Sequence, residues 1–382
     1  MRKSKLKGQL KTHYLKEEIL VSSQVNPPKF SKGKLWRVKK RKRKKSKVSR
    51  IRPKIEEAVK SISFFSLLSS LKIIGVGGGG CSIISEIAGE MKGEGFIAAN
   101  TDAQALNQIV APNVTRFQFG QNLTFGLGAG MNPDLGREAA ENEKEKIKGI
   151  FKDTEFCILI SCLGGGTGSG ASPVFAEAAR EVKCLSFGIF TLPFQFEGEK
   201  RAQISREALE KLKSKLNGFA VISNENIFQV IDKDTPLKEA FFRVNKILSD
   251  SLKGLIESIY STGLINIDFS DLKHILRGKG ELSYLNTLEL ERSDHLEESV
   301  KRVLQNPLYS YSVEGAKGVL FHISGGQNLS LTDVEKISQT ISSAVGPRAR
   351  VAFGVTQNED YQDKVKITLL ATGCGKEEKP EE

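Results

Sequence analysis

The sequence lacks the features of a membrane protein or of a protein from an oxidising compartment. No stretch of its 382 residues approaches the ~18 consecutive apolar residues of a membrane-spanning helix. No apolar run with a small-residue cleavage site follows the basic N-terminus, so a secretory signal is not expected. The five cysteines show no C-x-x-C spacing, which fits reduced thiols better than a disulfide framework or a zinc site. We therefore expect a cytoplasmic protein without a metal site of its own.

Positive charge is concentrated at the start of the chain. Residues 1–70 contain 22 Lys and Arg against 4 Asp and Glu, whereas residues 71–382 contain 35 against 41. The net charge of +12 therefore describes a basic arm on a mildly acidic body. Residues 1–55 are poor in apolar residues, which predicts a mostly disordered arm. The arm could bind nucleic acid through its phosphates, or an anionic membrane with the help of an apolar patch at 62–68. Alternatively, the arm has no partner and is a passive tail or the product of a misjudged gene start.

From residue 71 onward, strand-like and helix-like segments alternate, which predicts a parallel α/β sheet. Strands are predicted at 71–76, 96–100, 156–161, 185–192 and 218–223, and helices at 133–151, 171–182 and 200–216. Residues 236–260 place apolar residues 3.6 apart, as in a single helix of about 37 Å. Strand-like runs at 318–323, 350–355 and 366–371 then flank a helix, for which Thr332 and Glu335 predict a capping box. The chain therefore ends in a smaller α/β domain.

Two glycine-rich segments each follow a predicted strand and open a predicted helix. In the first, Gly75-x-Gly77-x-x-Gly80 also fits a dinucleotide fingerprint, with Asp102 near the distance of a ribose-binding acid, so this segment alone does not separate NAD from a nucleoside triphosphate. The second, Gly164–Gly170, contains five glycines and two hydroxyls. A dehydrogenase has no use for a second loop of this kind, so the pair favours a polyphosphate gripped from two sides. The P-loop pattern G-x-x-x-x-G-K-S/T is absent from the sequence.

With these motifs the chain resembles the tubulin/FtsZ family of GTPases, and within it the bacterial cell-division protein FtsZ. The resemblance runs from about Leu71 to Gly375 and keeps the family's order of motifs. The matching segments are 99–106, 126–130, 164–170, 193–198, 263–271 and 371–373. It implies a Rossmann-like GTPase domain at 71–235, a central helix at 236–260 and a C-terminal domain at 261–375. The basic arm at 1–70 and a short charged tail at 376–382 flank them.

The resemblance also implies a set of GTP- or GDP-binding residues. The implied phosphate contacts are Gly78, Gly79, Gly80, Cys81, Ser82, Ala129, Gly130, Gly165, Gly166, Thr167, Gly168, Ser169 and Gly170. Asp102, Glu197 and Arg201 complete the phosphate and ribose site. Asn224 and Asn245 would read the guanine edge, because an amide presents a donor and an acceptor together, and Phe241 would stack on the base. Phe241 and Asn245 lie four residues apart on the long helix and so share a face.

Asn266, Asp268 and Asp271 are the predicted catalytic residues. Two carboxylates three residues apart at a helix start lie on one side of it, where they can orient or deprotonate a water and help hold Mg²⁺. The resemblance implies that this loop enters the nucleotide site of the next subunit. The expected protein is a head-to-tail homopolymer that hydrolyses GTP, bound with Mg²⁺, at the subunit contact, at the cell-division site. The alternatives are a DNA-partition filament that uses the basic arm and a nucleotide-binding regulator that never polymerises.

Several positions depart from the family's pattern. Ser82 stands where Asn is usual, and Ser169 stands where FtsZ proteins usually carry Thr. Asn245 stands where Asp is commoner, and Met131 replaces a small residue beside the third phosphate loop. The sequence ends at Glu382 without the long linker and terminal peptide through which FtsZ proteins meet their membrane adaptors. The adaptor is therefore not predicted.

Overall fold

The computed structural model describes residues 70–91, 93, 95–232, 234–292 and 295–375. All of the described residues belong to one unit, Ile55–Glu382. The predictions for the basic arm, for the apolar patch at 62–68 and for the tail at 376–382 fall outside the described residues.

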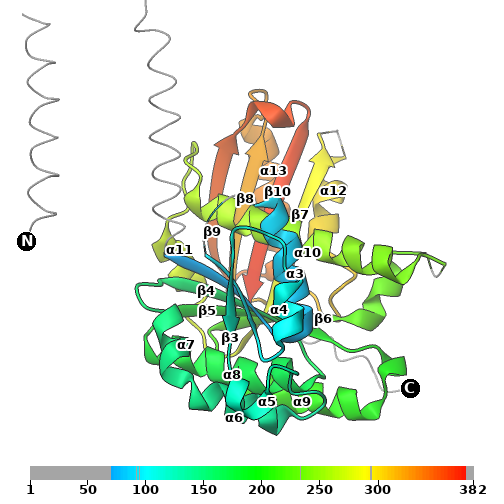
Figure 1. The fold of residues 1–382 in the computed structure, drawn as a ribbon. Coiled ribbons are helices and arrows are strands. Elements are labelled where there is room, and N and C mark those ends of the chain that lie inside the picture. Colours follow the sequence, from blue (N-terminus) through cyan, green and yellow to red (C-terminus); the bar gives the residue numbers. More distant parts are fainter. Residues whose placement is uncertain (1–69, 92, 94, 233, 293–294, 376–382) are drawn as a thin grey trace, which may run out of the picture. The chain divides into compact units, whose positions relative to one another are not determined.

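Six parallel strands form the N-terminal part of the sheet (Figure 1). They are β1 (Leu71–Val76), β2 (Phe96–Asn100), β3 (Val114–Gln118), β4 (Phe156–Cys162), β5 (Leu185–Leu192) and β6 (Gly218–Ser223). Their order is β3-β2-β1-β4-β5-β6, and every neighbouring pair is parallel. This is the Rossmann order, in which the chain leaves β1 and β4 toward opposite halves of the sheet.

Helices cover both faces of these strands. They are α3 (Gly77–Glu90), α4 (Ala103–Asn107), α5 (Gln121–Thr124), α6 (Pro133–Asn142), α7 (Lys144–Ile150), α8 (Gly166–Glu181) and α9 (Glu199–Lys213). One core joins residues of α6, α7, α8 and α9 to one face of the sheet, and the other joins α3 and the central helix α10 (Leu237–Tyr260) to the opposite face. The single helix predicted at 133–151 is broken at Glu143, whose ψ is 20° and whose carboxylate accepts a hydrogen bond from the Gly120 N–H.

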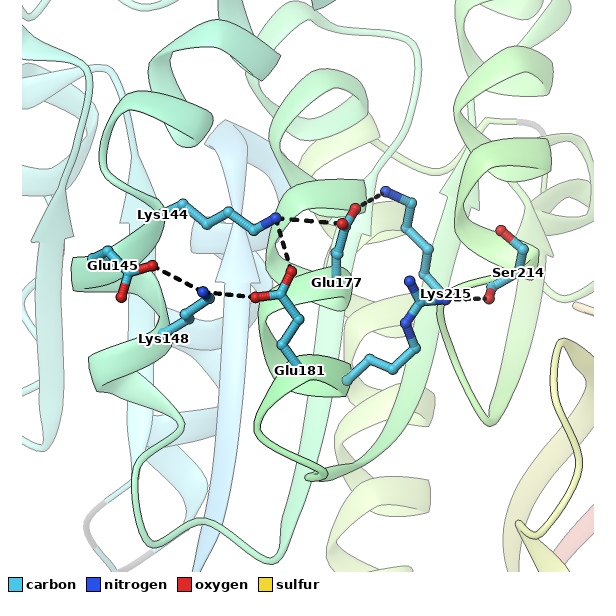
Figure 2. Close-up of polar contacts among 8 residues, drawn as sticks. Lys144, Glu145, Lys148, Glu177, Glu181, Ser214 and Lys215 are labelled. Atoms are coloured by element: carbon cyan, nitrogen blue, oxygen red, sulfur yellow. Dashed lines mark hydrogen bonds and ion pairs between the residues drawn. The ribbon is translucent and has the colours of Figure 1, made fainter.

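Ion pairs fasten the helices of one face to each other (Figure 2). Lys144 contacts Glu177 and Glu181 of α8, Lys148 contacts Glu181, and Lys215 contacts Glu177. Hydrogen bonds from Lys148 and then Lys144 lower the pKa of the Glu181 carboxyl to about 2. Partly exposed pairs of this kind add little to stability one by one, but several of them connect α7 to α8.

The central helix α10 (Leu237–Tyr260) leads into a mixed C-terminal sheet (Figure 1). The C-terminal part contains α11 (Phe269–Ile275), β7 (Glu281–Glu291), α12 (Leu296–Leu304), β8 (Gly318–Gly325), α13 (Leu331–Val345), β9 (Arg350–Gln357) and β10 (Lys364–Thr372). The described chain also contains the short 3₁₀ helices η1 (Gln195–Glu197) and η2 (Asn224–Gln229) before α10, and η3 (Glu359–Tyr361) after β9. The strand order is β7-β10-β8-β9, and β10 is antiparallel to both neighbours. Two register pairs between β6 and β7 join the two parts. The predicted fold class is confirmed.

In the C-terminal part, strand β7 was not predicted and one local prediction, the capping box of α13, was wrong. Strand β7 was missed because polar residues interrupt its apolar pattern, although Asn286 is buried and donates a hydrogen bond to the carbonyl of Val303. The capping box of α13 is formed by Ser330 and Asp333 rather than two residues later. Asp333 also pairs with Arg292 at 2.9 Å, which anchors the start of the helix to the end of β7. In the described part of the chain, no helix is both long enough and apolar enough to span a bilayer.

Candidate functional site

A cavity of about 610 Å³ lies at the carboxyl ends of the N-terminal strands. Helix α3 begins at Gly77 directly after β1, and α8 begins at Gly166 shortly after β4. Because β1 and β4 are neighbours and their connections diverge, a crevice forms there, as in other doubly wound sheets. The first turns of both helices line the cavity, so their free N–H groups and positive dipole ends provide an anion-binding surface.

The glycines of the two segments fall into two physical groups. A Cβ built at Gly78 or at Gly165 meets no atom within 4 Å, so each leaves open space on the cavity side. A Cβ at Gly79 would lie 2.4 Å from the Cys162 Sγ, and one at Gly168 would lie 2.7 Å from a backbone oxygen. The first group therefore leaves room for a ligand, and the second lets α3 and α8 pack closely on the sheet.

Most of the predicted nucleotide-binding residues line this one cavity. They are Gly78, Gly79, Ser82, Asp102, Ala129, Gly130, Gly165, Gly166, Thr167, Gly168, Glu197, Arg201, Asn224, Phe241 and Asn245. They come from seven separate parts of the chain, and the sheet topology brings them together. The cavity thus combines bare amides at one end with amide and aromatic side chains at the other.

Four predicted residues lie behind the cavity wall instead. A Cβ at Gly80 would lie 2.5 Å from a backbone oxygen of β4, and one at Gly170 would lie 2.0 Å from the backbone of α6. The Cys81 Sγ lies 3.5 Å from a carbonyl oxygen of β2, and burial raises the pKa of this thiol to about 12. The Ser169 hydroxyl accepts a hydrogen bond of 2.8 Å from the N–H of Gly164. These four shape the cavity from behind rather than line it.

Polar side chains at the rim are already held in place by neighbours. The Asp102 carboxylate caps α4 by accepting two backbone N–H groups, at 2.8 and 3.0 Å. Glu197 accepts hydrogen bonds from the Arg201 guanidinium at 2.7 Å and from the Phe194 N–H at 2.9 Å. The hydroxyl of Thr167 is 2.7 Å from that of Thr101, below the surface. The first turn of α8 therefore offers backbone N–H groups, rather than this hydroxyl, to the cavity.

The amide and aromatic end of the cavity includes residues that sequence reasoning missed. Asn224, Phe241 and Asn245 lie there as predicted, with Glu86 of α3 in addition. The other missed lining residues are Ile83, Asn100, Ala105, Leu127, Gly128, Cys162, Leu163, Thr191, Pro193 and Val244. Several of them stand at the carboxyl ends of strands, which is the signal that could have found them. Glu86 follows Ser82 by four residues and therefore lies on the same side of α3.

The predicted catalytic residues lie together but outside this cavity. Asp268 caps α11 by accepting the N–H groups of Ser270 and Asp271, and the Asp271 carboxylate accepts the N–H of Asp268 in return. The hydrogen bond from the Ser270 hydroxyl, followed by the backbone N–H of Asp271, lowers the pKa of the Asp268 carboxyl. Asn266 accepts the Gly263 N–H at 2.6 Å. None of the three predicted residues is among those that line the cavity.

Strand β9 holds the loop that carries these residues. Ile265 and Val355 form an antiparallel bridge with N···O distances of 2.8 and 3.2 Å. One residue further along β9, the Thr356 hydroxyl lies 2.9 Å from Nε2 of buried His322. The acidic loop is thus fixed to the edge of the C-terminal sheet. Among the described residues, no group of three or more His, Cys, Asp or Glu is arranged to hold a metal ion.

Two family models match the chain. The GTPase domain of the tubulin/FtsZ family matches residues 70–232, and the C-terminal domain of the FtsZ family matches residues 284–375. An empty FtsZ dimer from M. jannaschii is similar at 35% identity and a TM-score of 0.72, covering 84% of this chain and 92% of that one.

Two structures from Haloferax volcanii share the fold. A CetZ2 protofilament with bound GTPγS is 19% identical with a TM-score of 0.69, covering 81% of this chain and 94% of that one. A GDP-bound CetZ1 monomer is 20% identical with a TM-score of 0.68, covering 80% and 94%. At this identity the two structures support the fold alone.

Proposed function

Since this chain belongs to the tubulin/FtsZ family of GTPases, we propose that it binds GTP in the 610 Å³ cavity and polymerises head to tail. GTP is hydrolysed at the contact between subunits. The phosphates lie over the first turns of α3 and α8, where Gly78 and Gly165 leave room and free N–H groups bind anions. Asn224, Phe241 and Asn245 contact the base. A Mg²⁺ ion bound with the nucleotide would offset the negative charge of the phosphates.

The separation of the acidic loop from the cavity is the observation that carries the shared-site proposal. The carboxylates that line the cavity are those of Glu86, Asp102 and Glu197, and each already accepts a hydrogen bond from its own subunit. Among the described residues, the carboxylates of Asp268 and Asp271 accept hydrogen bonds from groups at the start of α11, namely the backbone N–H groups of residues 268, 270 and 271 and the Ser270 hydroxyl. A second subunit can supply these two carboxylates to orient the attacking water.

Exposed apolar side chains at both positions support the same arrangement. At the cavity, Leu127 is 76% exposed and Phe196, next to the lining residue Glu197, is 73% exposed. At the acidic loop, Leu264 is 68% exposed. A second copy that placed its acidic loop at the cavity would cover these side chains. A contact between two different surfaces does not close on itself, so it produces open filaments.

We propose cell division as the cellular role, because the C-terminal residues match the FtsZ model and the solved FtsZ structure is 35% identical. A CetZ-like role is the competing assignment within the family. The DNA-partition filament depends on residues 1–55, which lie outside the described residues, and it stays a prediction. The expected place of assembly is the division site.

GTP turnover per subunit, measured against protein concentration, tests the proposal. We expect turnover to rise steeply above a threshold concentration at which light scattering also rises. A fluorescent GTP analogue should be displaced by GTP far more readily than by ATP. A specific activity that stays constant from nanomolar to tens of micromolar protein would instead show an active site complete within one subunit.

A further inference from the structure

Guanine and adenine differ in the donors that they present to a binding site. Guanine carries two adjacent donors, N1–H and the N2 amino group, beside its O6 acceptor. At the corresponding positions adenine has an acceptor at N1 and a donor at N6. A carboxylate accepts hydrogen bonds only, so it matches the two donors of guanine and meets the N1 of adenine unfavourably. An amide alone can accept with one atom, which makes Asn245 an incomplete partner for this edge.

The structure places a carboxylate beside that amide. Nδ2 of Asn245 donates a hydrogen bond of 2.9 Å to Oε2 of Glu86, and both side chains line the cavity next to Phe241. One amide hydrogen of Asn245 is therefore directed at Glu86, and no described residue donates a hydrogen bond to the second carboxylate oxygen of Glu86. Eight residues separate Gly78 from Glu86 on α3, or about 12 Å along the helix. The negative charge of Glu86 thus lies well away from the proposed phosphate position.

No cation neutralises Glu86 in the part of the chain that the structure describes. Lys246 follows Asn245, but its ammonium group pairs with Glu90 and Asp250, each at 2.8 Å. Glu90 lies four residues beyond Glu86 on α3 and also accepts from the Ser249 hydroxyl. On α3, the Glu90 carboxylate is therefore paired with a cation and a hydroxyl. The Glu86 carboxylate lines the cavity, and the amide of Asn245 is its one hydrogen-bond donor among the described residues.

We propose that Glu86 is the residue that selects guanine, by accepting hydrogen bonds from its N1–H and N2 amino groups. Asn245 acts through Glu86, because its amide holds the carboxylate at the base end of the cavity. The assignment rests on the proposed GTP site and deepens it. It also accounts for an amide at position 245, because the carboxylate comes from the neighbouring helix instead.

Glu86→Gln tests the assignment, with Glu90→Gln as the matched control on the next turn of the same helix. GTP, ITP and ATP are each titrated against a fluorescent GTP analogue, and thermal unfolding confirms that each variant is folded. We expect Glu86→Gln to lower GTP affinity by about ten- to a hundredfold, as for the loss of hydrogen bonds to a charged group. Because ITP lacks the 2-amino group, the GTP-to-ITP ratio should fall toward one, and ATP affinity should not fall.

A swap of the two groups distinguishes recognition from a structural effect. Adding Asn245→Asp to Glu86→Gln restores a carboxylate and an amide to the same place in exchanged order, and we expect it to recover the preference for GTP over ATP. Glu90→Gln should leave all three affinities unchanged. If Glu86→Gln keeps the GTP-to-ITP and GTP-to-ATP ratios, the assignment is wrong while the GTP site stands. If the unaltered protein does not prefer GTP to ATP, the proposed site itself fails.

Discussion

Gly165→Ala separates ligand binding from folding more cleanly than most substitutions in the site. Gly165 precedes α8 with φ −101° and ψ 172°, a backbone conformation open to any residue. A Cβ built there meets no atom within 4 Å, so the methyl group disturbs no contact of the protein. It would instead occupy the space on the cavity side that we assign to phosphate.

The substitution should affect folding little and binding strongly. Folding stability should change by no more than about 1 kcal/mol, because alanine restricts the unfolded chain but is a poorer N-cap of α8 than glycine. GTP binding should weaken, because a displaced phosphate loses at least one charge-assisted hydrogen bond worth about 1.5–3 kcal/mol. That loss corresponds to about a ten- to a hundredfold increase in the Kd for GTP.

Displacement of a fluorescent GTP analogue measures the affinity, and urea unfolding without nucleotide measures the stability. Gly168→Ala is the matched control, since a Cβ there would lie 2.7 Å from a backbone oxygen. That variant should lose about 1–3 kcal/mol of stability from overpacking. If Gly165→Ala is stable and binds GTP with unchanged affinity, the phosphates do not lie over the start of α8 and this interpretation of the cavity is refuted.

Two further predictions concern stability. Burial and then nearby Lys366 lower the pKa of His322 from 6.5 to about 4, so the unfolded state binds the proton first. The free energy of unfolding should therefore decrease by about 3 kcal/mol as the pH falls from 6.5 to 4, and urea melts of His322→Gln should lack this share of the decrease. A Cβ at Gly254 of α10 would lie 2.3 Å from the Thr368 hydroxyl, so Gly254→Ala should cost about 1–3 kcal/mol in thermal unfolding despite its gain in helix propensity. Gly89→Ala on α3 has open space and should stabilise; equal effects of the two glycine substitutions would contradict the packing described for α10.

Much of the fold was predictable because its signals are local. Strands β2, β5 and β6 have the predicted bounds, since each is a short apolar run between glycines or polar turns. Strand β7 could not be found in this way, because buried Asn286 and Thr287 break its pattern, and both form hydrogen bonds to partners distant in the sequence. The break at Glu143 likewise depends on a distant backbone group, the N–H of Gly120.

The same distinction applies to the candidate site. The glycine segments are visible in the sequence because the short turn from strand to helix requires them, and the structure brings both to one cavity. The sequence places Glu86 on the same side of α3 as Ser82, but its place beside the base-binding residues depends on the hydrogen bond to Asn245, 159 residues later in the chain. Local patterns in the sequence thus predicted where phosphates could bind. The side chain that we assign to base selection, Glu86, could be identified only from the folded structure.

A mixing experiment tests the shared site most directly. Asp271→Asn removes a carboxylate of the acidic loop but keeps an oxygen that can accept the Asp268 N–H. Gly165→Asp places a negative charge at the proposed phosphate position, where Asp also suits the N-cap of α8. Neither variant alone should hydrolyse GTP. In a one-to-one mixture that co-assembles at random, a quarter of the contacts join an intact cavity to an intact loop, so about a quarter of the unaltered turnover should return. Filaments that contain both variants in co-sedimentation and still do not hydrolyse GTP would contradict the account.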